Sequence, residues 1–222
     1  MIKKAIPLGE WPNLLDAGFK RYYILDHIKH LNKDKKLKSI ISIQEPIVLK
    51  KEKNIYLWIC FSIISQQLST KVAKIIQQRF LDLFDSKKPS LEEIISTPFD
   101  TLKGIGLSES KTNYLLNVCN FFLEHKLTDS KLNKIDDETL IDLLIQIKGV
   151  GRWTVEMILM FALGREDVFA LDDLGIQQKM CTLFEIDNTN KKEMKLQMIA
   201  ISASWSPYRT YACRYLWGWK SA

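Results

Sequence analysis

The chain has 222 residues, 46% hydrophobic and 26% charged, so it can bury a full core and has the composition of an ordinary globular protein. A net charge of +6 and a pI near 9.0 favour a polyanionic partner weakly, because a solvated lysine surface explains the same charge. No apolar run is long enough to span a membrane and the first residues lack the apolar core of a signal peptide, so we expect a cytoplasmic protein.

The four cysteines, Cys60, Cys119, Cys181 and Cys213, are far apart in the sequence and show no Cys-x-x-Cys or Cys/His spacing. Such spacing is typical of zinc sites and of cysteine-ligated iron–sulfur clusters. We therefore expect free, buried thiols in a reducing compartment, no metal held by side chains, and no required cofactor.

Apolar residues recur at helical spacing along most of the chain. The pattern predicts helices over 14–31, 55–65, 69–84, a short stretch from 90, 108–123, a stretch from 136, a stretch from 152, 173–183, 191–203 and 208–219. Ser69 and Ser108 are predicted N-caps, Ser90 and Glu93 form a predicted capping box, and 128–134 reads as a polar linker. No segment alternates with period two, so we predict an essentially all-α protein.

Two Gly-x-Gly segments, at 104–106 and 149–151, lie between predicted helices. Glycine allows a tight turn and a close approach of another surface, and the helix that follows presents free N–H groups and a positive dipole end. The second segment is flanked by Leu144 and Ile158, which can pack the two helices together. The pattern indicates a helix-hairpin-helix that binds a phosphate, although an ordinary tight turn between helices has the same glycines.

Two adjacent carboxylates, Asp172 and Asp173, follow an apolar run at 168–171. One of them can cap the helix that runs toward residue 183. The other must face a partner or solvent, because an unpaired buried carboxylate is costly.

Three segments, at 147–154, 167–176 and 205–209, resemble the 3-methyladenine DNA glycosylase II branch of the helix-hairpin-helix DNA glycosylase superfamily. Segments 64–69 and 104–108 also resemble it, and the likeness covers roughly 56–219. The resemblance implies two helical lobes with an active-site cleft between them. The central lobe with the hairpin would span 53–168, and 1–52 with 169–222 would form the second.

The resemblance implies a monofunctional DNA glycosylase for base excision repair, which hydrolyses the N-glycosidic bond of alkylated purines, 3-methyladenine first. The partner would be double-stranded DNA containing a damaged base, and the protein a nucleoid-associated monomer. Two alternatives stay open: a glycosylase for another damaged base, and a non-catalytic helix-hairpin-helix DNA-binding protein.

Asp173 matches the catalytic aspartate of the resembling family, and Asp172 would then be the neighbouring helix cap. The carboxylate would stabilise the oxocarbenium-like sugar or activate water. Related branches with lyase activity hold a lysine after the residue that corresponds to Arg152, and this lysine forms a Schiff base. Trp153 stands there in this chain, so the resemblance implies base release without strand cleavage.

Trp153, Trp205 and Tyr208 are the predicted base pocket. Alkylation at a ring nitrogen makes a purine cationic, and an indole face attracts such a base by about 0.5–2 kcal/mol. Both tryptophans could instead be core residues. Tyr22 and Tyr23 are further candidates for the pocket lining.

The predicted DNA-binding residues of the hairpin are Lys148, Gly149, Val150, Gly151, Arg152 and Thr154. Gln66, Gln67 and Leu68 form a turn that could wedge into the duplex when the base leaves the stack. Gln66 could instead brace the turn and Leu68 could be core. The superfamily also suggests a monovalent cation on the hairpin carbonyls. Arg209 is predicted to be a structural ion-pair partner.

Overall fold

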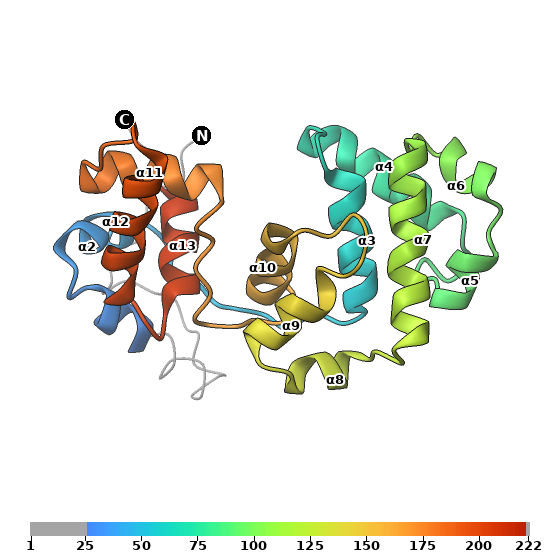
Figure 1. Cartoon of the computed structure of the whole chain (residues 1–222), viewed down its shortest axis with the longest axis horizontal. Coiled ribbons are helices and arrows are strands. Elements are labelled where there is room, and N and C mark those ends of the chain that lie inside the picture. The colour runs from blue at the N-terminus through green and yellow to red at the C-terminus, as the bar shows by residue number, and fades with distance from the viewer. Residues whose placement is uncertain (1–25, 221–222) are drawn as a thin grey trace. The chain divides into compact units, whose positions relative to one another are not determined.

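The computed structural model describes residues 26–220, and every regular element in that range is a helix, which confirms the all-α prediction (Figure 1). Of the segment predicted to be helical at 14–31, residues 26–31 are helical; the rest, with Tyr22 and Tyr23, lies outside the described residues. Within residues 26–220 no helix is sufficiently long and hydrophobic to cross a membrane.

The chain divides into two compact units, unit 1 of Met1–Lys50 with Gly164–Ala222 and unit 2 of Lys51–Leu163. Besides the helical residues 26–31, unit 1 contains α2 (Lys35–Ile41), α11 (Leu174–Phe184), α12 (Lys191–Ala203) and α13 (Arg209–Gly218). In unit 2 they are α3 (Ile55–Ser65), α4 (Thr70–Asp82), α5 (Leu91–Ser96), α6 (Phe99–Gly104), α7 (Glu109–Glu124), α8 (Asp129–Lys134), α9 (Asp137–Leu144) and α10 (Arg152–Phe161).

The boundaries between the two units along the chain lie at 50/51 and 163/164, whereas the family resemblance implied lobe boundaries at 52/53 and 168/169. Hydrogen bonds account for the observed boundaries. The backbone N–H of Glu52 donates to the carbonyl of Ala162, which ties this residue to unit 2. The N–H of Val168 donates to Thr210 Oγ1 at 3.0 Å, and the N–H of Thr210 donates to the carbonyl of Glu166. Residues 166–168 are therefore held by α13 in unit 1.

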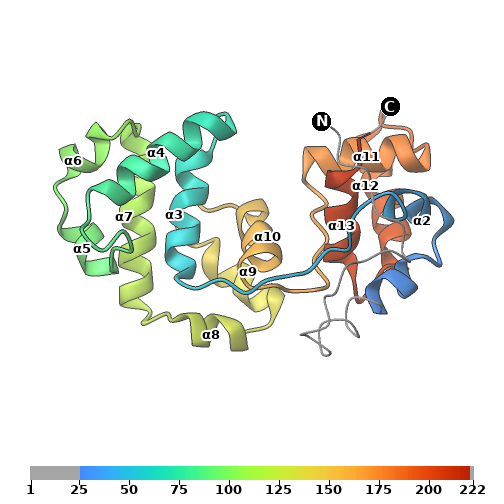
Figure 2. The ribbon, with the colours of Figure 1, turned by 180° about the vertical axis from the view of Figure 1, so that it is seen from behind.

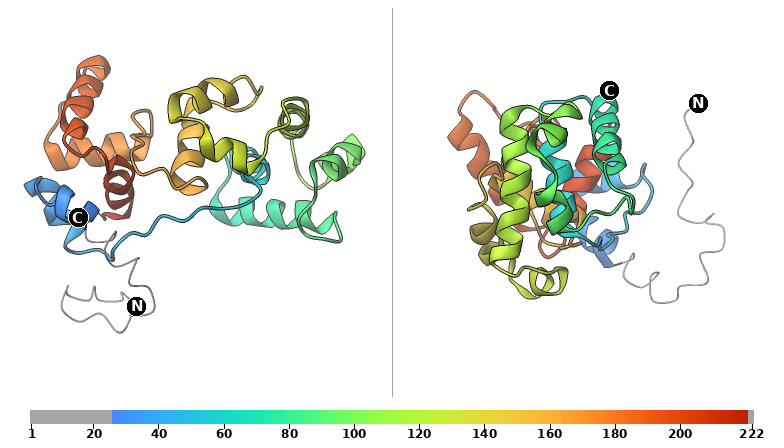
Figure 3. Two further views of the ribbon diagram at one scale, coloured as in Figure 1. Left: turned by 90° about the horizontal axis from the view of Figure 1, so that it is seen from below. Right: turned by 90° about the vertical axis from the view of Figure 1, so that its right-hand side faces the viewer.

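Unit 2 is built around α3, whose Ile55, Ile59, Ile63 and Ile64 are fully buried. It packs against α4, α7 and α10. Figures 1 and 2 show α3 between α7 and α10, and in the left view of Figure 3 both α3 and α7 are seen nearly end-on. The largely apolar sequence of α3 follows from this position, because neighbouring helices cover several of its faces.

The predicted N-terminal caps are confirmed. Ser69 Oγ accepts from the N–H of Val72, Ser108 Oγ accepts from the N–H of Lys111, and the Ser90 capping box is complete. These bonds satisfy N–H groups that have no partner inside their helices.

The polar linker predicted at 128–134 is wrong, because α8 occupies it. Thr128 caps this helix. The Asp129 carboxylate accepts from the N–H groups of Asn54 and Ile55 at 2.7 and 3.0 Å, so it also satisfies the start of α3. This short polar helix is held by bonds to a segment more than 70 residues away, which local composition does not reveal.

The hairpin between α9 and α10 depends on Gly149. Its φ is +104°, in the region that L side chains rarely adopt. A Cβ added there would lie 2.3 Å from Cγ of Tyr114 on α7, so the backbone rests directly on the aromatic ring. Gly151, by contrast, has a φ of −97° and open space around it. Only the first of the two glycines is sterically required.

We expect Gly149→Ala to lower the free energy of unfolding by about 2–4 kcal/mol, from backbone strain and from overlap with Tyr114. The matched variant Gly151→Ala should cost less than about 1 kcal/mol. Urea unfolding of the two variants, followed by circular dichroism, measures the difference. Equal losses would show that the contact with Tyr114 does not constrain the hairpin.

Candidate functional site

The hairpin presents backbone N–H groups at the start of α10. The N–H of Val150 donates to the carbonyl of Ile147 at 2.9 Å and the Val150 side chain is buried, so this residue closes the turn. In the described part of the chain, the N–H groups of Gly149 and Gly151 have no hydrogen-bond partner. With the first-turn N–H groups of α10, they form the kind of positive end that binds anions.

The predicted DNA-binding side chains differ in their surroundings. Lys148 is exposed, whereas the Thr154 side chain is 4% exposed. The first-turn N–H of Thr154 is the group available to a phosphate, and its DNA-binding role stays a prediction. The Arg152 guanidinium binds Glu138 at 3.0 and 3.2 Å and Glu156 at 3.2 Å, and the hydrogen bond to Glu138 is the main cause of its raised pKa. Two local carboxylates therefore offset the charge of Arg152.

A recess of about 300 Å³ lies against α3, α4 and α10 in unit 2. Its walls are Trp58, Phe61, Ser62, Ser65, Gln77, Met157 and Ile158. Trp153 is 42% exposed and lies one helical turn before Met157, so the two side chains share a face of α10. The recess combines aromatic, methionine and hydroxyl groups, which is typical of small-molecule and base sites.

Asp173 is the N-cap of α11. Its Oδ1 accepts from the N–H of Ile176 and from Nε1 of Trp217, both at 2.8 Å. The prediction that Asp172 caps this helix is wrong, since Asp172 instead forms an exposed ion pair with Lys195. Two donors on one oxygen fix the orientation of the Asp173 carboxylate.

The sequence did not single out Trp217 or Gly175. A Cβ on Gly175 would lie 3.0 Å from Asp173 Oδ1 and 3.4 Å from Trp217 Nε1, so its absence leaves room for their hydrogen bond. Glycine is unfavourable inside a helix, and Gly175 stands in the first turn of α11. The presence of a destabilising glycine in this turn is the sequence signal from which close packing of another side chain could have been inferred.

Trp205, which was predicted to line a base pocket, lies in the core of unit 1. Its side chain is 1% exposed, packs against Phe169 and Phe184, and donates from Nε1 to Asp34 Oδ2 at 3.0 Å. Asp34 also caps α2, so Trp205 joins α2 to the core of unit 1. A tryptophan enclosed in this way has no face to offer a ligand.

Tyr208 is half-buried at the start of α13 and lies edge-on to His30 and Tyr211. Its role in a base pocket stays a prediction. The structural role predicted for Arg209 is confirmed: Nε and Nη2 bind the Asp167 carboxylate at 2.7 and 2.9 Å. Burial alone would raise the pKa of Asp167, but hydrogen bonds from Arg209 and Ser206 hold it below its usual value.

The Gln66–Leu68 turn follows α3. Gln66 Nε2 donates to the carbonyl of Gly149 at 3.3 Å, so this amide braces the turn against the hairpin. Gln67 is exposed and has a φ of +58°, while Leu68 is half-buried. Of the three predicted wedge residues, Gln67 is therefore the one whose side chain is most accessible.

Among residues 26–220, no cluster of three or more His, Cys, Asp or Glu side chains could hold a metal ion. None of the four cysteines, all of which lie in the described range, forms a disulfide; Cys60, Cys119 and Cys213 are buried and Cys181 is half-buried. The candidate functional groups are therefore the hairpin, the recess with Trp153 and the Gln66–Leu68 turn in unit 2, and, separately, the Asp173 carboxylate in unit 1.

Several known proteins resemble this chain along most of its length. The DNA-3-methyladenine glycosylase 1 of Schizosaccharomyces pombe is 32% identical over 194 residues, which cover 86% of this chain and 84% of that protein. A solved structure of the 3-methyladenine DNA glycosylase of S. pombe in complex with abasic DNA is 31% identical, with a TM-score of 0.74, and covers 86% of this chain and 95% of that one. The DNA-3-methyladenine glycosidase structure from Bacillus halodurans is also 31% identical, with a TM-score of 0.76 and 88% of each chain covered.

The family model of the HhH-GPD superfamily base excision DNA repair proteins matches residues 60–201. The match includes the lining of the recess except Trp58, both Gly-x-Gly segments, Trp153 and Asp173. The chain belongs to the HhH-GPD superfamily of base excision DNA repair proteins.

Proposed function

We propose that this protein is a monofunctional DNA glycosylase that hydrolyses the N-glycosidic bond of alkylated purines, 3-methyladenine first, in double-stranded DNA. The Asp173 carboxylate, oriented by Trp217 and by the N–H of Ile176, is the observation that carries the proposal. The relatives named 3-methyladenine glycosylases, one of them solved with abasic DNA, support the choice of substrate.

The chemistry follows from the charge of the lesion. An alkylated purine is cationic, so when the bond to C1′ breaks, the base takes the electron pair and leaves as a neutral molecule. Positive charge then develops on the sugar, where a fixed carboxylate stabilises it. Water adds to C1′ and loses a proton, which leaves an abasic sugar. Asp173 serves as the stabilising carboxylate or as the base for water.

Unit 2 supplies the binding groups. The N–H groups of Gly149 and Gly151 hold a backbone phosphate, and Gln67 enters the gap that the extruded nucleotide leaves. The recess beside Met157 receives the base, with Trp153 on the same helix face offering its electron-rich ring to a cation. Trp153 also has no amine with which to form a Schiff base.

A monovalent cation on the hairpin carbonyls stays a proposal on which no step depends. The carbonyls of Lys148 and Gly149 accept hydrogen bonds from the side-chain amides of Asn117 and Gln66. A cation there would share these oxygens through their second lone pairs. The monomeric state and the cytoplasmic location are also still predictions.

A panel of duplexes with 3-methyladenine, 7-methylguanine, hypoxanthine or 8-oxoguanine tests the function directly. We expect release of the two cationic bases to be fastest, with the abasic strand intact until alkali is added. Asp173→Asn should reduce release by about 100-fold or more while binding of an abasic duplex changes little. Full release by this variant would contradict the mechanism, and binding without release by the native protein would favour the non-catalytic alternative.

Trp217→Phe tests how Asp173 is oriented, because it removes the Nε1 donor and keeps an aromatic ring. We expect the single-turnover rate to fall by about 10- to 100-fold, in line with one hydrogen bond to a charged group. Trp219→Phe is the matched control two residues away, where Lys179 lies over the ring. Equal rates in the two variants would remove Trp217 from the site.

A further inference from the structure

Lys111 of α7 holds the end of α3. Its Nζ donates to the carbonyls of Ile64 and Gln66, at 2.9 and 2.6 Å. Both carbonyls lie at the C-terminal end of α3, where they lack partners within the helix. Burial lowers the pKa of Lys111, because desolvation disfavours the charged ammonium. Lys111 thus fixes the backbone from which the Gln66–Leu68 turn leaves.

Two further residues on the same side of α7 hold the hairpin. The Tyr114 ring lies beneath Gly149 at a distance that leaves no space for a Cβ. Asn117 Nδ2 donates to the carbonyl of Lys148 at 3.3 Å. Lys111, Tyr114 and Asn117 are spaced three residues apart, so they are neighbours along the helix surface. We call these three residues the α7 brace.

The two loops also contact each other and carry strain. Gln66 Nε2 donates to the carbonyl of Gly149 at 3.3 Å. The next residue, Gln67, has a φ of +58°, which for a residue with a side chain is a strained conformation. Such a conformation persists only where the surroundings impose it, and strained residues gather at functional sites. Here the surroundings are Lys111 on one side of the turn and the hairpin on the other.

We propose that the α7 brace sets the spacing between the Gln66–Leu68 turn and the phosphate-binding hairpin, so that Gln67 enters the base stack only while the hairpin holds the backbone. The proposal rests on the proposed function. Lys111 and Asn117 are positioning residues, because they donate to backbone carbonyls of the two loops and act through that backbone. Their loss should therefore impair extrusion of the nucleotide more than binding of DNA.

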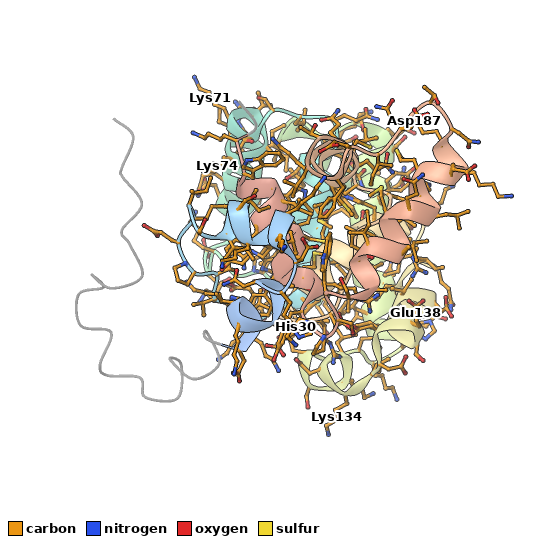
Figure 4. The ribbon with its side chains drawn as sticks, turned by 90° about the vertical axis from the view of Figure 1, so that its left-hand side faces the viewer. His30, Lys71, Lys74, Lys134, Glu138 and Asp187 are labelled. Carbon is orange, nitrogen blue, oxygen red and sulfur yellow. The ribbon has the colours of Figure 1, made fainter. Side chains whose placement is uncertain are left out.

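The experiment uses the variants Lys111→Met and Asn117→Ala in the full chain. Asn113→Ala is the control for Asn117, because Asn113 lies on the same helix and its side-chain amide donates to the carbonyl of Glu109 within that helix. Lys134→Met controls for the loss of one positive charge; this exposed lysine projects away from the ribbon in Figure 4. If Lys111→Met does not fold, Asn117→Ala still tests the role of the brace.

Single-turnover release of 7-methylguanine is measured from two duplexes. In one the lesion is paired with cytosine, and in the other it lies opposite an abasic site, where extrusion breaks no base pair. We expect both brace variants to lose about tenfold on the paired duplex and less than about twofold on the other. Both controls should match the native protein. An equal loss on the two duplexes, or no loss on either, would overturn the proposal.

A second measurement separates the brace from the proposed function. A duplex with a tetrahydrofuran abasic site next to 2-aminopurine becomes more fluorescent when a side chain opens the stack. We expect the native protein and both controls to raise the fluorescence equally, and the brace variants to give less than half the rise at saturation. If the native protein releases no base but this pattern holds, the proposed function fails and the brace stands. An equal rise in all variants, or no rise at all, overturns the brace.

Discussion

The close packing of Gly149 against the Tyr114 ring is the contact on which the position of the hairpin in unit 2 depends. Because no side chain separates the two, the hairpin backbone comes close enough for Asn117 to reach the carbonyl of Lys148. The same approach brings the carbonyl of Gly149 within reach of Gln66. Because Gly149 has no Cβ, α7 and the end of α3 can both bind the hairpin loop through its carbonyl groups. The N–H groups of Gly149 and Gly151 are not used in these contacts.

The structural role of the Asp173 carboxylate is compatible with the chemical role that we propose for it. As an N-cap it satisfies the N–H of Ile176 at the start of α11, and the same oxygen accepts from Trp217. A carboxylate at this position also faces the positive end of the helix dipole. Asp172 is exposed and paired with Lys195, and lacks this fixed geometry. Of two adjacent aspartates, the one held from two sides is the one suited to act on a sugar.

Local patterns predicted the local parts of this fold. Ser69, Ser90 and Ser108 cap helices as their spacing indicated, since a cap depends only on the next three residues. The helix at 129–134 was missed because Asp129 is held by N–H groups of α3, far away in the sequence. The sequence pattern identified both glycines of the hairpin. It did not show that only Gly149 is sterically required, because that requirement comes from a tertiary contact with the Tyr114 ring.

The tryptophans show the limit of residue type as a guide. Trp153 and Trp205 were both predicted to meet a base, yet one is 42% exposed and the other 1%. Trp217, which the sequence left unmarked, is the one bonded to Asp173. What distinguishes them is the partner of the indole N–H, Asp34 for Trp205 and Asp173 for Trp217, and both partners are distant in sequence. Gly175 is the one local sign of the contact between Asp173 and Trp217. Glycine destabilises a helix, so its presence in the first turn of α11 indicates that another side chain comes close there.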